Sequence, residues 1–380
     1  MAARRRLRSW RDLVSSCRFA HTKLGRHMQF DSTASQGCGV SQSMWRYAAA
    51  ALTAFAGGLL LVGSATADSY VQRSEVQSYM DELIATHGFS RIALEEVFSQ
   101  STKQERIIEL MSRPAERRLV WHEYRKILVD EPRVSQGVEF WRENEQALER
   151  AAKTYGVVPE IIVAIIGVET RYGRVTGSFG VVDALSTLAF DYPPRAKFFR
   201  GQLTEHFLLS REEGKNPLSM KGSYAGAMGF GQFIPSSYRA YAVDFDHDGV
   251  RDIWANKTDA IGSVANYFAE HGWQGSKDVV ERVTLIEETP EVGALINNGL
   301  KPTVTVADWR AMGVQVNAEQ DDARHATLMR MEQPNGNEYW LGFDDFYVIT
   351  RYNHSRLYAM AVHQLSQAIR KRRESSATPT

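Results

Sequence analysis

Apolar residues recur at helical spacing over most of this chain, and the pattern predicts a mainly α-helical (α+β) fold with a small β-containing part. We expect an N-terminal helical domain over residues 68–140, whose first helix carries an apolar stripe and stops at Gly88. A second helical block over residues 141–277 would form the core, and residues 336–370 would complete it with a last helix. The apolar positions of that helix are Tyr358, Val362, Leu365 and Ile369.

The pattern changes between residues 278 and 335, where short β-prone runs alternate with Gly, Asn and Pro. We interpret this stretch as a small β-containing insertion in the helical core. The chain ends in a basic segment rich in Ser and Thr, residues 371–380, and its polar composition predicts disorder.

One predicted helix is almost entirely apolar and ends in a single carboxylate. Pro159 suits its first turn, where the missing N–H of proline is not needed. Glu169 would lie at the inner end of this buried segment, near the negative end of the helix dipole, and both effects raise the pKa of a carboxyl group. This is the environment of a general acid, although a glutamate that reaches solvent at a helix end gives the same pattern. Arg171 would point about 200° around the helix from Glu169.

A second informative segment, residues 223–238, alternates small residues with aromatic residues and one amide. Its glycines allow the backbone to approach a ligand closely, and Gln232 can both donate and accept hydrogen bonds. No Asp or Glu occurs between residues 216 and 243. Chemistry in this segment would therefore depend on neutral groups.

Composition and charge narrow the class of protein. A chain of 380 residues with 43% hydrophobic content is large enough for two or three subdomains. Residues 1–67 hold nine of the 45 basic and two of the 45 acidic residues, so the remainder has 36 against 43 and a formal charge of −7. This balance argues against nucleic acid as a partner.

The N-terminal region resembles an export signal. Arg46 precedes an apolar run over residues 48–62, and an A-x-A sequence ends at Ala67, so cleavage before Asp68 is expected. A single membrane anchor is the alternative, but the run is short and contains glycines. Residues 1–43 have no role in such a signal, and Met44 would then be the true start.

Both cysteines, Cys17 and Cys38, lie upstream of the predicted cleavage site. The exported part would contain no disulfide, thiol nucleophile or zinc–thiolate site. No cysteine follows the apolar run either, so a lipid anchor has no acceptor. We therefore expect a protein that is soluble in the periplasm.

Three motifs together closely resemble the lytic murein transglycosylase B family: residues 167–173, the Gly-rich segment, and residues 349–355. The resemblance covers roughly residues 75–370 and preserves the order of the motifs. It implies a lysozyme-like core that cleaves the bond between N-acetylmuramic acid and N-acetylglucosamine in peptidoglycan. In this family one glutamate protonates the glycosidic oxygen, the substrate N-acetyl group stabilises the oxocarbenium-like centre, and the same glutamate deprotonates the muramyl C6 hydroxyl. The product is a 1,6-anhydro sugar.

The resemblance also implies which residues form the site. Glu169 would be the acid and the base. The substrate-binding residues would be Ser223, Gln232, Tyr124, Tyr267, Tyr352, Asn353, Tyr358 and Arg195. A tyrosine taken alone is more often a core residue with a satisfied hydroxyl. Family members often carry two consecutive arginines where this chain has Pro194 and Arg195, so one of the two cations is missing.

An acidic loop begins at Asp244, with carboxylates at its positions 1, 3, 5 and 9 and Gly249 at position 6, which is the cadence of an EF-hand loop. Position 12 is Ala255, and the resemblance implies a longer loop closed by a later aspartate. The expected ligands are Asp244, Asp246, Asp248, the carbonyl of Val250, Asp252 and Asp259. Calcium is the expected ion, sodium is an alternative, and its role would be structural. A solvated acidic turn would explain the same residues.

We therefore interpret the sequence as a monomeric peptidoglycan lytic transglycosylase without an organic cofactor, acting on glycan strands with or without other cell-wall remodelling proteins. A lysozyme-type hydrolase is the nearest alternative, because it cleaves the same bond with water. A peptidoglycan-binding scaffold without turnover is the alternative from a different class.

Overall fold

The computed structural model describes residues 69–112, 119–275 and 278–377. The upstream extension, the export signal and its cleavage site lie outside the described residues. The described chain is predominantly helical with a small β-containing part, as the hydrophobic pattern predicts. Within these residues no single helix is long and apolar enough to cross a membrane, and only one sharply bent pair, Glu145–Tyr155 with Pro159–Thr170, meets the length and composition requirement.

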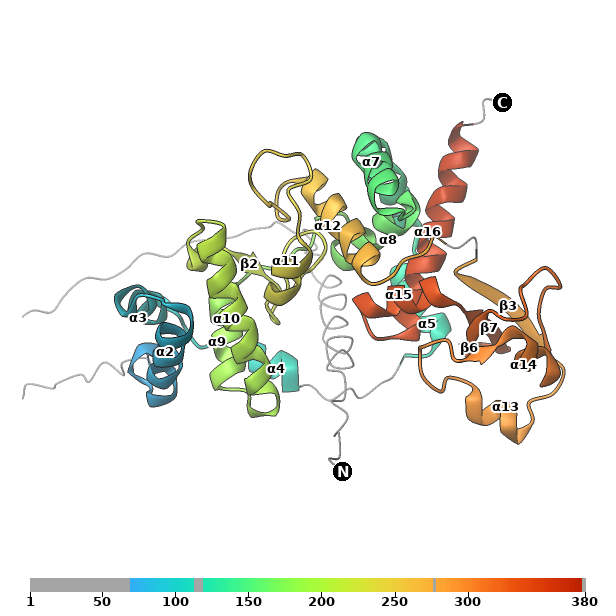
Figure 1. Cartoon of the computed structure of the whole chain (residues 1–380), viewed down its shortest axis with the longest axis horizontal. Coiled ribbons are helices and arrows are strands. Elements are labelled where there is room, and N and C mark those ends of the chain that lie inside the picture. The colour runs from blue at the N-terminus through green and yellow to red at the C-terminus, as the bar shows by residue number, and fades with distance from the viewer. Residues whose placement is uncertain (1–68, 113–118, 276–277, 378–380) are drawn as a thin grey trace, which may run out of the picture.

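The first helices of the described chain pack beside two later helices (Figure 1). These elements are α2 (Ser74–His87), α3 (Arg91–Gln100), α4 (Glu105–Ser112), α9 (Val181–Phe190) and α10 (Ala196–Glu212). The ring of Phe98 contacts those of Phe190 and Phe207, which joins α3 to both later helices. The predicted stop at Gly88 is confirmed, since Gly88 caps α2 in the left-handed conformation.

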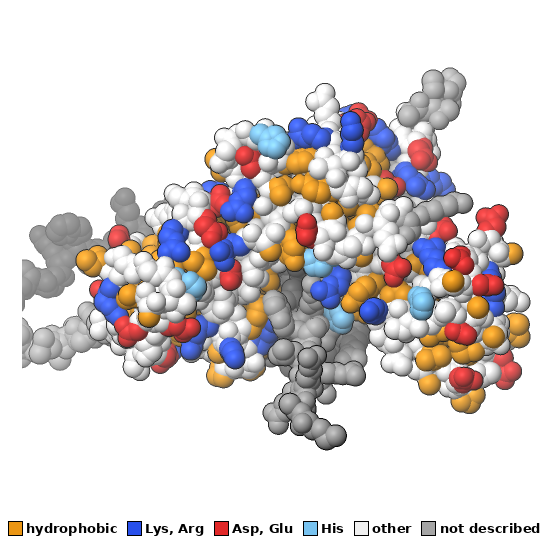
Figure 2. Space-filling view, in the orientation of Figure 1, with side chains coloured by type: hydrophobic (Ala, Val, Ile, Leu, Met, Phe, Trp, Pro, Cys, Tyr) orange, Lys and Arg blue, Asp and Glu red, His pale blue; other side chains and the backbone are white. Residues whose placement is uncertain are grey.

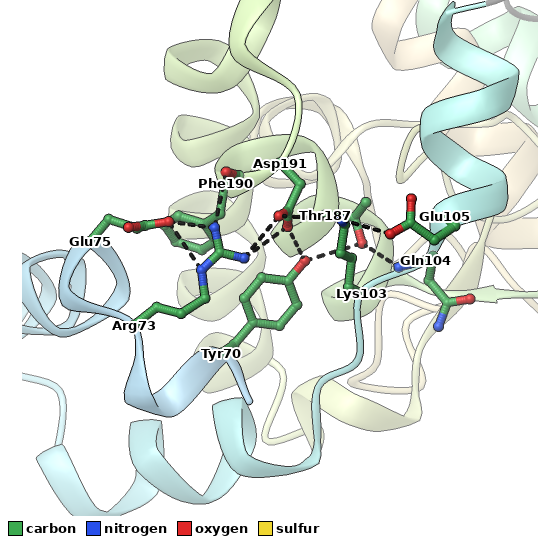
Figure 3. Close-up of polar contacts among 9 residues, drawn as sticks. All are labelled: Tyr70, Arg73, Glu75, Lys103, Gln104, Glu105, Thr187, Phe190 and Asp191. Atoms are coloured by element: carbon green, nitrogen blue, oxygen red, sulfur yellow. Dashed lines mark hydrogen bonds and ion pairs between the residues drawn. The ribbon is translucent and has the colours of Figure 1, made fainter. Parts of the chain in front are cut away.

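A polar junction fixes this group of helices to the end of α9 (Figure 3). The hydroxyl of Tyr70 donates to Asp191 Oδ2 at 2.6 Å, and Arg73 Nη1 donates to Asp191 Oδ1 at 2.9 Å. The backbone N–H of Gln104 donates to Thr187 Oγ1 at 3.0 Å. Burial, reinforced by Asp191, raises the pKa of Tyr70, so the phenol stays protonated and the junction holds.

The core is built around α8 (Pro159–Thr170) and α16 (Arg356–Ala377), which pack against each other. Residues 161–166 of α8 are fully buried, as an apolar segment of this length requires. The surrounding helices are α5 (Trp121–Leu128), α6 (Glu131–Glu143), α7 (Glu145–Tyr155), α11 (Pro235–Tyr241), α12 (Lys257–Glu270) and α15 (Asp344–Tyr352). The domain boundary predicted at residue 140 falls inside α6, and α6 packs on both central helices.

The prediction of disorder from residue 371 was wrong for residues 371–377, because α16 continues to Ala377 (Figure 1). Arg372 Nη1 lies 2.7 Å from Glu131 Oε1 of α6, and Arg373 is paired with Glu145 of α7. The basic residues that suggested a polar tail therefore hold the last turns of the helix against the core.

The predicted β-containing insertion is a five-stranded antiparallel sheet in the order β4-β6-β7-β3-β5. Its strands are β3 (Val280–Leu285), β4 (Val304–Thr305), β5 (Val314–Gln315), β6 (His325–Gln333) and β7 (Gly336–Gly342), accompanied by α13 (Pro290–Leu295) and α14 (Val306–Ala311). Trp309, Leu328 and Leu341 belong to its own small core.

The last long strand, β7, extends the insertion beyond its predicted end at residue 335. It pairs with β6 through a two-residue turn at Pro334 and Asn335 and with β3 on its other side. Gly336 follows this turn with a positive φ of 132°, which glycine adopts more readily than other residues.

Candidate active site

A cleft is lined by the end of α8 together with parts of α5, α10, the Gly-rich segment and α16. It brings together residues that lie far apart in the sequence. The predicted site residues that line it are Tyr124, Glu169, Arg195, Ser223, Gln232, Asn353 and Tyr358. Of the predicted set, Tyr267 and Tyr352 lie outside its lining.

Glu169 is the only acidic residue among the described residues that line the cleft. It is half-buried near the end of α8, where the buried part of the helix gives way to the cleft. The helix end is fixed by the next residue, since Thr170 Oγ1 donates to the carbonyl of Phe230 in the Gly-rich segment at 3.0 Å. The carboxylate therefore has a defined position facing that segment.

Tyr358 holds the carboxylate from α16, the helix that packs against α8. Its hydroxyl donates to Glu169 Oε1 at 2.5 Å, and its ring is buried in α16. This hydrogen bond fixes one carboxylate oxygen of Glu169 against α16.

The Gly-rich segment forms a rigid wall. Short bridges pair Met228 with Gly222 and with Phe233, and a side chain on Gly229 would come within 2.3 Å of the Ile253 carbonyl. Glycine is required there by this contact and by its positive φ of 66°. The wall can therefore hold side chains in fixed places beside Glu169.

Both predicted polar residues of this wall are anchored by the backbone. Gln232 adopts a positive φ of 52°, and its Nε2 donates to the carbonyls of Thr176 at 3.1 Å and Gly229 at 3.0 Å. Ser223 Oγ accepts from the N–H of Ala227 at 3.0 Å. Strained backbone at a non-glycine residue is common where a side chain must be presented to a ligand.

The two tyrosines outside the lining lie behind the wall. Tyr352 donates its hydroxyl to the carbonyl of Gly231 at 2.5 Å, and Tyr267 donates to the carbonyl of Arg351 at 2.6 Å. Their rings contact each other with centroids 4.8 Å apart. They support the segments that carry Gln232 and Asn353, and their predicted contact with sugars stays a prediction.

Asn353 lines the cleft directly after α15. It is 4% exposed, and its Oδ1 has no hydrogen-bond partner in the described structure. A buried polar atom without a partner is costly, so it is a place where a ligand donor would bind favourably.

The remaining predicted residues form the far walls. Tyr124 lies buried on α5, and Arg195 precedes α10 with its guanidinium over the rings of Phe198 at 4.6 Å and Phe199 at 5.2 Å. Stacking of this kind stabilises a guanidinium away from water. Arg195 therefore contributes a largely enclosed cation to the cleft.

Sequence reasoning missed two further arginines of the lining, Arg133 and Arg171. The expectation that Arg171 points away from Glu169 was wrong, because α8 ends at Thr170 and Arg171 turns into the left-handed conformation with φ 50°. Gly173 was the available signal for this helix end. Nothing in the sequence marked Arg133, which reaches the cleft from α6.

The acidic loop is a separate site on the other side of the Gly-rich segment. Carboxylate oxygens of Asp244, Asp246 and Asp259 lie within 4.8 Å of one another. Asp259 is fully buried at the start of α12 and accepts from the N–H groups of Phe245 at 2.7 Å and Asp252 at 2.8 Å. Burial raises the pKa of Asp259, which is the direction a nearby cation would oppose.

The other predicted ligands of the loop are engaged differently. Asp248 Oδ1 accepts from the N–H of Val250 at 2.8 Å, and Asp252 Oδ1 accepts from Trp254 at 2.9 Å and from Ala255 at 3.0 Å. Asp244 and Asp246 also accept backbone N–H groups of the loop, but only their oxygens and those of Asp259 converge. Three convergent carboxylates suit a hard cation that takes six to eight oxygen ligands.

Comparison with known proteins identifies the family. Residues 72–367 match the transglycosylase SLT domain. The chain is 43% identical over 309 residues to the membrane-bound lytic murein transglycosylase B of Escherichia coli (strain K12), covering 79% of this chain and 84% of that protein.

Solved structures agree. The catenated lytic transglycosylase SltB1 from Pseudomonas aeruginosa superposes with a TM-score of 0.77 at 49% identity, covering 80% of this chain and 99% of that one. The Escherichia coli lytic transglycosylase Slt35 in complex with calcium gives 0.73 at 43% identity, covering 80% and 95%. SltB3 from Pseudomonas aeruginosa in complex with NAG-anhNAM-pentapeptide gives 0.69 at 29% identity, covering 77% and 78%. With a family match over most of its length and these lysozyme-like neighbours, the chain belongs to the lytic transglycosylase family of peptidoglycan-cleaving enzymes that carry the SLT domain.

Proposed function

We propose that this protein cleaves the β-1,4 bond between N-acetylmuramic acid and N-acetylglucosamine in peptidoglycan and leaves a 1,6-anhydromuramoyl end. The observation that carries the proposal is the single acidic residue in the described lining of the cleft, Glu169. Hydrolytic glycosidases usually use two carboxylates, one as acid and one as base or nucleophile. One carboxylate suits a reaction in which the substrate supplies its own nucleophile.

In the proposed mechanism, protonated Glu169 donates its proton to the glycosidic oxygen as the bond to muramyl C1 breaks. The substrate N-acetyl group stabilises the positive charge that develops at C1. The Glu169 carboxylate then takes the proton of the C6 hydroxyl while the C6 oxygen bonds to C1. This step closes the 1,6-anhydro ring and restores the acid, so no water enters the product.

The surrounding side chains support each stage of this cycle. The hydroxyl of Tyr358, 2.5 Å from Glu169 Oε1, would stabilise the carboxylate that exists between the two proton transfers. The anchored side chains of Gln232 and Ser223 would orient the sugar, and the unpartnered Oδ1 of Asn353 would accept from one of its donors. The bound NAG-anhNAM-pentapeptide of the relative SltB3 is a peptide-bearing anhydro sugar, so we propose strands with stem peptides as the substrate.

Product mass tests this function. After digestion of purified peptidoglycan, an anhydro product has a mass one water below the corresponding hydrolytic product. We expect the lower mass in liquid chromatography with mass spectrometry. The higher mass would identify a lysozyme-type hydrolase, and an unchanged substrate would identify a scaffold without turnover.

We also propose a calcium ion in the acidic loop, held by Asp244, Asp246 and Asp259. The support is the convergence of three carboxylates and the calcium complex of the relative Slt35. The ion would fix the loop before α12, and sodium would use the same oxygens less strongly. The cleft chemistry does not depend on it, since none of these three residues lines the cleft.

Export to the periplasm remains part of the proposal and is consistent with the membrane-bound relative in Escherichia coli. On the face shown in Figure 2, the described basic and acidic side chains are interspersed. No extended basic patch of the kind that follows a nucleic-acid backbone lies among the described side chains of that face.

A further inference from the structure

The cleft has an unusual charge for a site that binds neutral sugars. Its described lining contains three arginines, Arg133, Arg171 and Arg195, against the single acid Glu169. The chain beyond residue 67 has a formal charge of −7, so the cleft differs from the average of the molecule. Clustered guanidinium groups favour an anionic ligand.

Two of these arginines, Arg133 and Arg195, are buried. Arg133 is 3% exposed, and its Nε and Nη1 donate to the carbonyls of Gly167 at 3.0 Å and Ile127 at 2.7 Å. Arg195 is 8% exposed, with its guanidinium over the ring of Phe198. Both guanidinium groups are therefore largely enclosed by the protein.

Arg171 differs from both in its exposure. Its side chain is 37% exposed, and its Nη2 lies 3.4 Å from Asp130 Oδ2, which is a long contact. Asp130 also accepts from the backbone N–H of Arg133 at 2.8 Å, where it caps α6. Because the ion pair is long and partly exposed, it is weak, and a substrate carboxylate can compete for the guanidinium.

The backbone at Arg171 is held in a strained conformation. Helices commonly end with glycine in the left-handed conformation, yet here Arg171 and Tyr172 both adopt it, with φ of 50° and 60°. The turn is locked because the Tyr172 hydroxyl donates to the carbonyl of Arg133 at 2.8 Å and the N–H of Arg171 donates to the carbonyl of Gly167 at 3.1 Å. Strain maintained by such contacts is typical of a residue with a role in binding.

We propose that Arg171 binds a carboxylate of the peptide carried by the glycan strand and so makes the enzyme selective for peptide-bearing strands. The inference rests on the proposed function, because it concerns the same cleft and substrate. A peptide provides a carboxylate at its end or on an acidic side chain, and amidation of that carboxylate removes its charge while the strand and its peptides stay in place. The planar guanidinium can bind that carboxylate through two parallel hydrogen bonds.

The test compares KM on two substrates, intact peptidoglycan strands and the same strands with their peptide carboxylates amidated. In Arg171→Gln the ratio of KM for strands with free peptide carboxylates to KM for amidated strands should rise about tenfold, since a charge-assisted pair is lost. Arg171→Lys should give an intermediate ratio, because lysine keeps the positive charge but lacks the planar guanidinium that can make two parallel hydrogen bonds. Arg174→Gln is the matched control, since Arg174 is exposed in the same loop but does not line the cleft.

An unchanged ratio in Arg171→Gln, or an equal rise in Arg174→Gln, would overturn the inference while the wild-type enzyme still formed its anhydro product. Absence of that product with wild type would instead refute the proposed function. Should the Arg171 variants fold poorly, competition on the wild type decides. A free peptide-bearing anhydro disaccharide should inhibit about tenfold more strongly than the same compound with its carboxylates amidated, and equal inhibition would contradict the proposal.

Discussion

The cleft and the acidic loop lie on either side of the same Gly-rich segment and use the same functional group in opposite ways. In the cleft one carboxylate, Glu169, stands among apolar walls and arginines. In the loop several carboxylates crowd together, and backbone N–H groups satisfy most of their oxygens. An isolated half-buried carboxyl can exchange a proton, whereas a cluster held by amides is suited to bind a cation. The two regions therefore differ in the arrangement of their carboxylates rather than in residue type.

The largest expected effect comes from removing the isolated carboxyl. Glu169→Gln keeps the shape of the side chain but cannot supply a proton, so kcat/KM should fall by at least about a thousandfold. Turnover of purified peptidoglycan and the melting temperature should be measured together.

The matched control is Glu160→Gln, at the other end of the same helix. Glu160 is buried and paired with Arg370 at 3.3 Å but does not line the cleft, so it should lose stability rather than turnover per folded molecule. More than a tenth of wild-type activity in Glu169→Gln would place the catalytic role elsewhere.

The second-largest expected effect is the stabilisation of the acidic loop by calcium. Calcium bound only by the folded protein should raise the free energy of unfolding by about 2.7 kcal/mol at a concentration about 100 times its Kd. Asp246→Ala should remove this increment because Asp246 belongs to the convergent group, and Asp248→Ala should retain most of it because Asp248 caps a turn. Melting curves with calcium and with chelator measure the calcium-dependent stabilisation of each variant. Identical curves for the wild type would show that the loop is a solvated turn without a bound ion.

The smallest effect separates a side chain that contacts the carboxylate of Glu169 from one that supports the Gly-rich wall. Tyr358→Phe removes the hydrogen bond to Glu169, so kcat should fall about tenfold with little change in the melting temperature. Tyr267→Phe removes a hydrogen bond to a backbone carbonyl outside the lining and should cost about 1 kcal/mol of stability instead. Equal losses of kcat in the two variants would show that Tyr358 and Tyr267 act in the same way.

Much of this architecture is predictable from the sequence because it depends on local patterns. The apolar run after Pro159 predicts a buried helix, and the structure has α8 from Pro159 to Thr170. The acidic loop is recognisable because its residues are consecutive. The family resemblance alone predicts Glu169, Gln232 and Tyr358 as site residues, and in the structure all three line one cleft.

What the sequence does not reveal depends on contacts between distant segments. Ideal helix geometry gave the wrong direction for Arg171 because α8 ends before it. The turn that follows is stabilised by the hydrogen bond from Tyr172 to the carbonyl of Arg133, nearly forty residues earlier. The basic tail appeared disordered because its partners, Glu131 and Glu145, lie on other helices. Which acidic residues of the loop converge depends on backbone geometry that spacing alone does not determine.

In the proposed mechanism one carboxylate performs both proton transfers and water stays out of the product. Digestion of peptidoglycan in water enriched in oxygen-18 tests both points at once. We expect a muramoyl end without the heavy isotope, at the mass of the 1,6-anhydro sugar, and no such product with Glu169→Gln. A muramoyl end that carries one oxygen-18 atom would contradict it, because a water molecule would then have cleaved the bond.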